Sequence, residues 1–460
     1  MFTVRILLLA SLCQLIGACS NEASDPSRDE SGLLETVSLG TASPETGSLE
    51  TDSLETDSLE PSSLETASFK SPAIQSGPLS RTIRGDVDLS DFYSYAGALP
   101  KSAGRLIQQQ RLGDHQQVPG AAQNIRLLYS STDGIDGETP IAVSGSLFLP
   151  QGTAPEGGWP LVAWTHGTVG IADHCAPSWT GYKPFHQRYL KQWLDQGYAI
   201  VASDYQGLGT AGTHPYLATK PASYSNLDII RAVQSADFPV SDKVVLIGQS
   251  QGAAAAFATA GYAQDYGSEI DILGVIATGI PMFTPRTIEI IQETRPNDVV
   301  DPMLGYNFLA LTLVEQFNDE FSYSDFISEV AMPTAMAVDT TCHSEVRELV
   351  VENGLTYDTS FKVSPTDALK GAFAQMGYPR FDISVPVFIG SGVNDRDTPL
   401  RMQAGLVKKA CVSGAVIESH IYPGHDHLTV LNHSTVNSIP FARNLFSGQA
   451  IVGNCDSLPF

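Results

Sequence analysis

One segment of this chain constrains its fold more than any other. The apolar residues 244–247 run into Gly248, Ser250 and Gly252 in the spacing G-x-S-x-G, and an alanine-rich stretch of high helix propensity, 253–260, follows. A buried strand that passes through a tight turn into a helix is typical of a nucleophile elbow, in which the serine hydroxyl projects from the turn. We therefore predict that Ser250 is a nucleophile and that larger side chains at the two glycines would collide with neighbouring backbone. The alternative role of Ser250, a helix N-cap, does not explain both glycines.

Short apolar runs alternate with helical stretches along most of the chain. This alternation predicts a mostly parallel sheet with helices on both faces, after an antiparallel opening pair at 125–130 and 141–149. Together with the nucleophile elbow, it indicates the α/β-hydrolase fold. From about 282 to 380 the sequence has helical periodicity and prolines but no convincing strand, which predicts an inserted helical cap. The catalytic domain as a whole is expected at 81–460. Its predicted buried strands are 161–164, 199–203, 244–247, 273–277, 385–390 and 417–422.

A serine hydroxyl becomes a good nucleophile only when a base removes its proton, and a carboxylate orients that base. The apolar run 385–390 ends in a loop rich in acids, at the sheet edge where catalytic groups gather. In this loop Asp395 fits the spacing G-x-x-D-x-x-[VT]-P that is common after this strand. Asp397 lies two residues before Pro399 and suits a cap of the following helix. Asp395 is therefore the predicted acid.

The last predicted strand leads into a loop with two histidines. His427 stands three residues after Gly424, the usual G-x-x-H spacing, and apolar residues that suit a packed helix follow it. We predict that His427 is the base and that His425 is a polar loop residue. The alternative is a zinc site, but adjacent loop residues rarely form a closed tetrahedral set. Its ligands would be His425, Asp426, His427 and His433.

The charge that develops on an attacked carbonyl oxygen needs two preorganised backbone N–H donors. One normally belongs to the residue after the nucleophile, here Gln251. The other comes from a loop after an earlier strand, and residues 164–168 form that loop. Thr168 or Gly167 is the expected second donor, whereas His166 is expected to be a structural loop residue. This set of groups implies no cofactor.

The N-terminal region is expected to serve export and anchoring. Arg5 precedes an apolar run that is too short for a membrane span, and two small residues stand before Cys19. This resembles a bacterial lipoprotein signal, 1–18, which would leave Cys19 acylated, while Ser20 would favour the outer membrane. The alternative is a conventional signal peptide cleaved nearby, with Cys19 as an ordinary thiol and a periplasmic or secreted protein.

Residues 19–80 are predicted to be an acidic low-complexity tether. A Ser-Leu-Glu unit recurs every five residues from Ser48 to Ser63, and residues 21–70 contain 12 acids and 2 bases. Such a segment buries too little apolar surface to offset its chain entropy. On a helix, leucines five residues apart would lie on different sides and form no apolar stripe, so a partner-binding helix is not expected.

Charge and cysteine content narrow the possible functions. The chain has 50 acidic and 26 basic residues and a net charge of −24, which excludes a nucleic-acid-binding surface. Beyond the N-terminal region four cysteines remain, an even number that is expected to form two disulfides in an oxidising compartment. The sequence does not give their pairing. Cys411 with Cys455 would fix the C-terminal tail, and Cys175 with Cys342 would tie a loop to the predicted cap.

Four blocks of sequence resemble the microbial secretory lipase family of α/β-hydrolases. The likeness spans roughly residues 95–450. The family more often has histidine where Gln249 stands and a further glycine where Ala253 stands. The blocks are H-G-T-V-G at 166–170, C-A-P-S at 175–178, D-Y-Q-G-L-G-T with H-P-Y within 204–216, and G-Q-S-Q-G at 248–252.

The resemblance implies lipase or carboxylesterase activity on an ester or lipid substrate, without a cofactor. It also implies that the helical cap lies over an acyl-binding pocket, where residues 308–311 would line the pocket or simply pack the cap. Asp204 and Tyr205 are expected to hold a turn near the site and to take no part in the chemistry.

Together these features predict an exported, lipid-anchored serine hydrolase. His427 would take the proton of Ser250, Asp395 would stabilise the imidazolium, and water would cleave the acyl-enzyme. An acyltransferase or a peptidase with the same triad is the nearest alternative, because the sequence does not reveal the acceptor. A non-catalytic surface lipoprotein with the same fold is disfavoured by the complete set of catalytic groups. Acyl-chain length and oligomeric state are not readable from the sequence.

Overall fold

The computed structural model of the protein describes residues 89–460. The predicted signal 1–18, the predicted lipidation site Cys19 and the whole tether predicted at 19–80 lie outside the described residues. In the described part of the chain, no helix is long and apolar enough to span a membrane.

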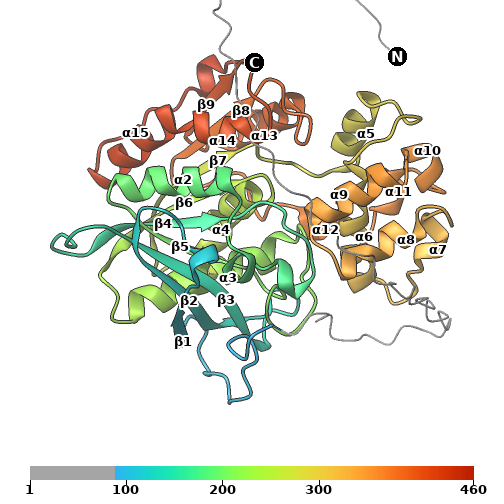
Figure 1. The fold of residues 1–460 in the computed structure, drawn as a ribbon. Helices are drawn as coiled ribbons and strands as arrows, with labels where there is room; N and C mark the ends of the chain where they lie inside the picture. Colours follow the sequence, from blue (N-terminus) through green and yellow to red (C-terminus); the bar gives the residue numbers. More distant parts are fainter. Residues whose placement is uncertain (1–88) are drawn as a thin grey trace, which may run out of the picture. The chain divides into compact units, whose positions relative to one another are not determined.

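A nine-stranded sheet forms the centre of the described residues, in the order β1-β2-β3-β5-β4-β6-β7-β8-β9 (Figure 1). Strands β1, β2, β3 and β5 pair antiparallel, and the pairs from β5 to β9 are parallel. The predicted fold class, including its antiparallel opening pair, is confirmed. The strands are β1 (Leu106–Arg111), β2 (Ala121–Thr132), β3 (Pro140–Pro150), β4 (Trp159–Thr165), β5 (Ala199–Ser203), β6 (Val240–Gln249), β7 (Asp271–Thr278), β8 (Val387–Gly392) and β9 (Ile417–Tyr422).

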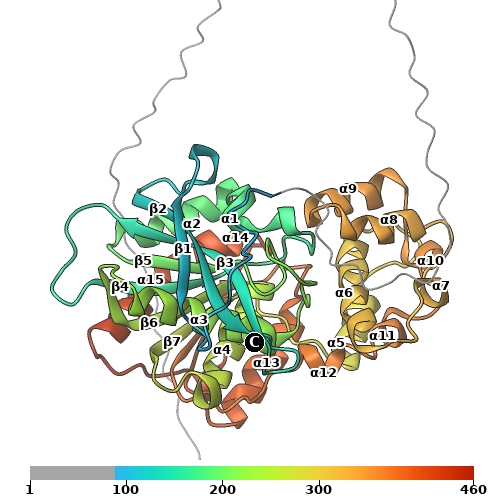
Figure 2. The same cartoon turned by 90° about the horizontal axis from the view of Figure 1, so that it is seen from below.

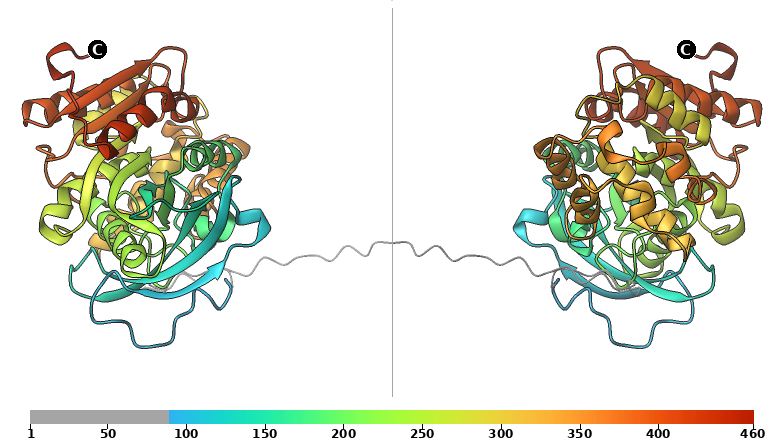
Figure 3. Two further views of the ribbon diagram at one scale, coloured as in Figure 1. Left: turned by 90° about the vertical axis from the view of Figure 1, so that its left-hand side faces the viewer. Right: turned by 90° about the vertical axis from the view of Figure 1, so that its right-hand side faces the viewer.

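Helices cover both faces of the sheet because its central strands are apolar on both sides (Figures 1 and 3). In β6, Val244 and Leu246 pack toward α3, α4 and α13, whereas Val245 and Ile247 pack toward α2, α14 and α15. All four side chains are fully buried. The covering helices are α2 (Pro184–Asp195), α3 (Thr219–Ser235), α4 (Gln251–Tyr266), α13 (Leu400–Val412), α14 (Thr429–His433) and α15 (Thr435–Phe446).

A helical insertion separates β7 from β8, and Figure 2 shows its helices gathered to one side of the sheet. It has its own apolar core, in which Phe308, Leu309 and Leu311 are fully buried. The prediction placed the cap at 282–380. The insertion contains α5 (Pro285–Glu293), α6 (Leu304–Phe317), α7 (Tyr323–Phe326), α8 (Met332–Met336), α9 (His343–Glu352), α10 (Tyr357–Ser360), α11 (Pro365–Ala368) and α12 (Phe373–Met376).

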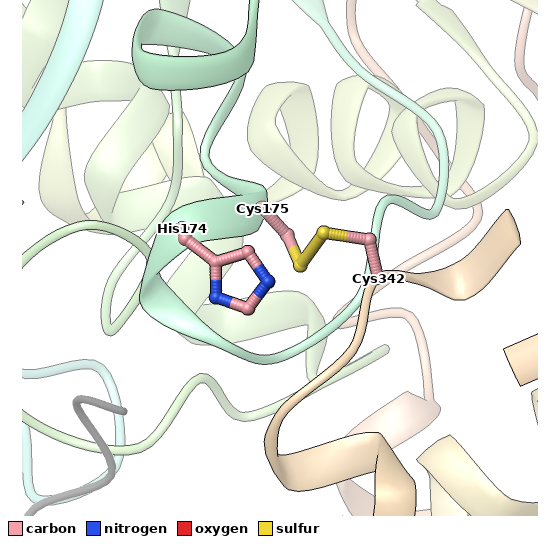
Figure 4. A group of neighbouring side chains, drawn as sticks. All are labelled: His174, Cys175 and Cys342. Carbon is pink, nitrogen blue, oxygen red and sulfur yellow. A yellow bond between two sulfur atoms is a disulfide. The ribbon is translucent and has the colours of Figure 1, made fainter. Parts of the chain in front are cut away.

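Two disulfides, in the pairings considered from the sequence, join distant segments. Cys411–Cys455 links α13 to the C-terminal tail. Cys175–Cys342 links the 3-10 turn that follows β4 to the residue before α9 (Figure 4). Beside this second disulfide, the backbone N–H of His343 donates to the Val169 carbonyl at 2.8 Å. The insertion is therefore attached to the loop after β4.

Candidate active site

Ser250 occupies the turn between β6 and α4. Its φ of 59° and ψ of −125° are rare for a residue with a side chain. Its side chain does not cap α4, and its N–H donates to the Thr278 carbonyl of β7 at 3.0 Å. A Cβ on Gly252 would overlap the Thr165 carbonyl oxygen, and one on Gly248 would overlap the carbonyl oxygen of Gly252. The two glycines thus allow the turn to approach β4 closely.

Asp395 and His427 meet at the carboxyl ends of β8 and β9. The two strands pair in parallel, so the loops that follow them are neighbours. The Nδ1 of His427 lies 2.7 Å from Asp395 Oδ2, and both side chains are buried. Asp395 Oδ1 accepts the backbone N–H groups of Asp397 and Thr398 at 2.9 and 2.8 Å. Gln403 donates to Oδ2 at 3.2 Å, so the carboxylate is held from several sides.

His427 and Ser250 line the same cavity. The His427 Nε2 is buried and has no hydrogen-bond partner among residues 89–460, and no hydrogen bond joins it to Ser250 Oγ. Burial is the largest single influence on the pKa of His427 and lowers it. The charge of Asp395, its hydrogen bond and the charges of Asp397 and Asp426 together outweigh burial and raise that pKa above the ordinary histidine value.

The structure also shows the contacts of His425 and Asp397, the residues weighed against His427 as base and Asp395 as acid. His425 stacks its ring on His433, with 3.9 Å between centroids. Asp397 does not cap α13, which corrects the role expected for it, because that helix has no side-chain cap. Its Oδ2 instead accepts the hydroxyl of Tyr306 from α6 at 3.0 Å and lies 3.9 Å from Arg347 Nη1 of α9. Asp397 thereby connects the loop of the predicted acid to the insertion.

The four residues considered for a zinc site do not bring three ligand atoms together. Within the described residues, one group of three possible ligands lies within 4.8 Å: His174, Cys175 and Cys342. Its two sulfur atoms form the disulfide, as Figure 4 shows, and so are not thiolates.

The residues predicted as oxyanion donors lie on either side of Ser250. Gln251 is the first residue of α4, where backbone N–H groups lack partners within the helix. Thr168 lies in the loop after β4, and its hydroxyl is hydrogen-bonded to that of Tyr216 at 2.8 Å. A Cβ on Gly167 would come within 3.4 Å of Ser250 Cβ, so this loop reaches the nucleophile.

Buried polar groups fix the loop after β4, as expected for structural residues. Tyr205, at φ 74°, donates its hydroxyl to the His166 carbonyl at 2.9 Å. The ring of His166 is hydrogen-bonded to the carbonyls of Gly167 and Asp204 at 2.7 and 3.2 Å. The carboxylate of Asp204 accepts from the N–H and the hydroxyl of Ser178. These bonds set the path of the backbone that carries Thr168.

Two cavities meet at Ser250, and Thr168 and Tyr306 line both of them. The first lies against α5 and α6 and is mostly apolar. The second is bordered by α2, α9 and the loop of His427, and histidines and charged side chains line much of it. Ala310 lines the first cavity, whereas the other residues of 308–311 pack the insertion. The apolar side chains of the first cavity include Leu217, Phe283, Ile288, Ile291, Met303 and Met376.

Several supporting residues were not predicted from the sequence. A Cβ on Gly279, which has a φ of 62°, would lie 3.0 Å from the ring of His427. Gln403 and Tyr306 contact the acid loop from α13 and α6. A glycine two residues after a predicted strand, here 273–277, is a usable signal for a residue such as Gly279. The contacts of Gln403 and Tyr306 depend on how helices pack and have no local signal.

Comparisons with known proteins agree with this fold. The Secretory lipase family model matches residues 184–454. Lipase A of Moesziomyces aphidis is 26% identical over 273 residues, which cover 55% of this chain and 56% of that relative, so the match spans little more than half of either protein.

Solved structures extend the likeness. Candida antarctica lipase A in its closed state superposes with a TM-score of 0.62 at 21% identity, over 81% of this chain and 87% of that one. The rice cell wall degrading esterase LipA from Xanthomonas oryzae gives a TM-score of 0.60 at 18% identity, over 76% of this chain and 100% of that one. At these identities the superpositions show the fold, while the family model covers more than half of the sequence. The chain belongs to the secretory lipase family.

Proposed function

We propose that this protein hydrolyses carboxylic esters, with Ser250 as nucleophile, His427 as general base and Asp395 as the acid that orients it. One observation carries the proposal. The buried hydrogen bond between His427 and Asp395 lies beside a cavity that Ser250 also lines, at a strained turn after β6. The family assignment and the names of the lipases and esterases with the same fold support the same reaction.

In the proposed mechanism, the Ser250 oxygen attacks the ester carbonyl while His427 Nε2 takes its proton. Asp395 holds Nδ1 and stabilises the imidazolium. The N–H groups of Gln251 and Thr168 bind the oxyanion, and His427 returns the proton to the departing alcohol. Water then attacks the acyl-enzyme by the same proton route in reverse and releases the acid.

The acyl chain is proposed to enter the mostly apolar cavity. That cavity begins at Ser250 and continues against α5 and α6 of the insertion, where Ile288 and Met303 line it. Burial of an alkyl chain there gains roughly 0.8 kcal/mol per methylene. The alcohol part of the ester would then lie in the second cavity.

The decisive experiment compares hydrolysis of p-nitrophenyl esters from acetate to palmitate by the full chain and three variants. Ser250→Ala and His427→Ala are expected to lose at least about 10³-fold in kcat. The matched control is His425→Ala, two residues from His427, which should keep its activity and its chain-length preference. Hydrolysis that is indifferent to Ser250 would disprove the mechanism.

We further propose that the protein is exported and anchored to a membrane by lipid on Cys19. The motif before Cys19 supports this proposal. The test is membrane fractionation with metabolic labelling by a palmitate analogue, for the full chain and for Cys19→Ala. Label and membrane association should both disappear in the variant. An unlabelled but membrane-bound wild-type chain would contradict the anchor.

A further inference from the structure

Gln249, which precedes the proposed nucleophile, has a side chain that no step of the mechanism above uses. It is the last residue of β6, and only 3% of it is exposed. Its Nε2 donates to the backbone carbonyl of His427 at 3.1 Å, although the two residues are 178 positions apart in the sequence. One buried hydrogen bond therefore joins the neighbour of the nucleophile to the backbone of the base.

Other groups must hold Ser250 and His427 in position relative to each other. Within residues 89–460, no hydrogen bond joins His427 Nε2 to Ser250 Oγ. The contact of His427 Nδ1 with Asp395 ties the base to the loop after β8. The bond from Gln249 ties it to β6, the strand that leads into Ser250. This bond is thus suited to set the distance between nucleophile and base.

The oxygen of the Gln249 amide is held as well. The side chain of His186, on α2, is hydrogen-bonded to that of Gln249. Burial lowers the pKa of His186 to about 3, and this bond acts in the opposite direction, as expected where a histidine donates to an amide oxygen. The oxyanion loop packs against the same oxygen, since a Cβ on Gly167 would lie 2.8 Å from Gln249 Oε1. These neighbours leave Nε2 directed at the His427 carbonyl.

Helix α14, which follows the base loop, is also tied to α2. Asn432 of α14 donates its Nδ2 to the Phe185 carbonyl at 2.9 Å. Phe185 is the neighbour of His186, so the bonds form a closed path that runs from Gln249 through α2 and α14 to His427. In this path, the bond from Gln249 is the one that contacts the base itself.

We propose that Gln249 is a positioning residue, which holds the backbone of His427 so that Nε2 lies within reach of the Ser250 hydroxyl. The inference rests on the proposed ester hydrolysis. A misplacement of a reacting group by about 1 Å can cost on the order of 10²-fold in rate. Because both polar atoms of the Gln249 amide face protein groups, the side chain should affect kcat more than KM.

The test replaces Gln249 by leucine, which has no donor, and by histidine, whose Nε2 lies the same number of bonds from Cβ. With p-nitrophenyl butyrate and the full chain, Gln249→Leu is expected to lower kcat by about ten- to hundredfold, with KM within about threefold. Gln249→His restores an N–H donor and should return kcat to within about fivefold of wild type.

The matched control is Gln234→Leu. The side chain of Gln234 donates to the Ser241 and Asp242 carbonyls at 3.1 and 2.8 Å, at the opposite end of β6 from Gln249. This variant should therefore keep the kcat of wild type. Thermal unfolding accompanies the kinetics, and Gln249→Met, which is unbranched, replaces the leucine variant if that protein does not fold.

Three kinetic results would overturn the proposal. The first is a stably folded Gln249→Leu or Gln249→Met with kcat within about threefold of wild type. The second is a rise in KM at unchanged kcat, which would make Gln249 part of the substrate-binding wall. The third is an equal loss of kcat in the leucine and histidine variants, since the donor would then not matter.

A spectroscopic measurement separates this inference from the proposed reaction. The low-field proton resonance of His427 Nδ1–H, assigned by its loss in His427→Ala, reports the contact with Asp395 without turnover. In full-length Ser250→Ala, adding Gln249→Leu should shift or broaden this resonance, whereas adding Gln234→Leu should not. An unchanged resonance means that Gln249 does not position the base, even when ester hydrolysis is confirmed. If Ser250→Ala still hydrolyses esters while the resonance responds to Gln249→Leu, the proposed function is wrong and the positioning role stands.

Discussion

The charge state of His427 sets the pH range of the proposed reaction. Only the neutral imidazole can take the proton of Ser250, and neighbouring carboxylates raise the pKa of His427 above 6.5 despite burial. Activity should therefore fall as the pH drops through a value above 6.5. The acid limb of kcat/KM for butyrate esters, followed by titration of the released acid, measures this value. A limb at or below 6.5 would contradict the prediction.

The two acids of the 394–398 loop should respond differently to loss of charge. Asp395→Asn removes the partner of His427 Nδ1 and is expected to lower kcat by about 10³- to 10⁴-fold. Asp397→Asn keeps an oxygen for the hydroxyl of Tyr306 and removes a charge that raises the pKa of His427 and lies 3.9 Å from Arg347 Nη1. It should move the acid limb to lower pH with less than about tenfold change in the plateau. Equal losses in the two variants would mean that Asp397 shares the catalytic role.

These residues also show which contacts of the site local sequence can predict and which it cannot. Asp395 and His427 follow strands at fixed spacings, so local sequence was enough to select them and their contact emerged in the structure. The interaction of Asp397 with Tyr306 spans 91 residues and depends on how the insertion packs, which no local pattern encodes. The prediction that Asp397 caps the N-terminus of α13 was wrong, because its carboxylate turns toward the insertion and away from that helix.

At the scale of elements, the buried strands were predictable and the edge of the sheet was not. The central strands are continuous apolar runs, whereas β1 is the polar, partly exposed stretch Leu106–Arg111 at the sheet edge. Strand β8 begins at Val387, two residues later than predicted, since Pro386 has no N–H for a ladder bond. The alternation of strands and helices along the sequence thus predicted the architecture, whereas the exact ends of the strands depend on backbone hydrogen bonding.

The two disulfides should differ in their effect on activity. Chain entropy predicts that loss of Cys175–Cys342, separated by 167 residues, costs about 5 kcal/mol of stability, and loss of Cys411–Cys455, separated by 44, about 4 kcal/mol. Removal of the first should also lower kcat/KM at temperatures where the fold persists, because Cys342 pairs with Gly170 next to the oxyanion loop. Double serine variants, compared by thermal unfolding and by butyrate hydrolysis, test this. If both folded variants have the same kcat/KM, the oxyanion loop does not depend on the Cys175–Cys342 disulfide.

On the scale of the whole molecule, the site exists only where two differently built parts meet. The sheet supplies Ser250, Asp395 and His427 from the carboxyl ends of three strands, in loops that local sequence identifies. The insertion supplies most of the apolar wall on one side of Ser250 and part of the polar wall on the other. The proposed reaction could therefore be inferred from the sheet sequence alone, whereas the substrate preference proposed for it rests on an insertion whose packing the sequence did not reveal.

A change in the insertion should consequently alter chain-length preference without altering the chemistry. Ala310 on α6 lines the apolar cavity and is 3% exposed, so Ala310→Phe would fill space that a long acyl chain needs. We expect kcat/KM for p-nitrophenyl laurate to fall by at least about tenfold while that for the acetate stays within about threefold.

Val330→Phe, at a 67% exposed position of the same insertion, controls for added bulk. Because overpacking can also destabilise the insertion, thermal unfolding of both variants accompanies the kinetics. A parallel fall for both esters in a stably folded Ala310→Phe would show that the acyl chain does not enter this cavity.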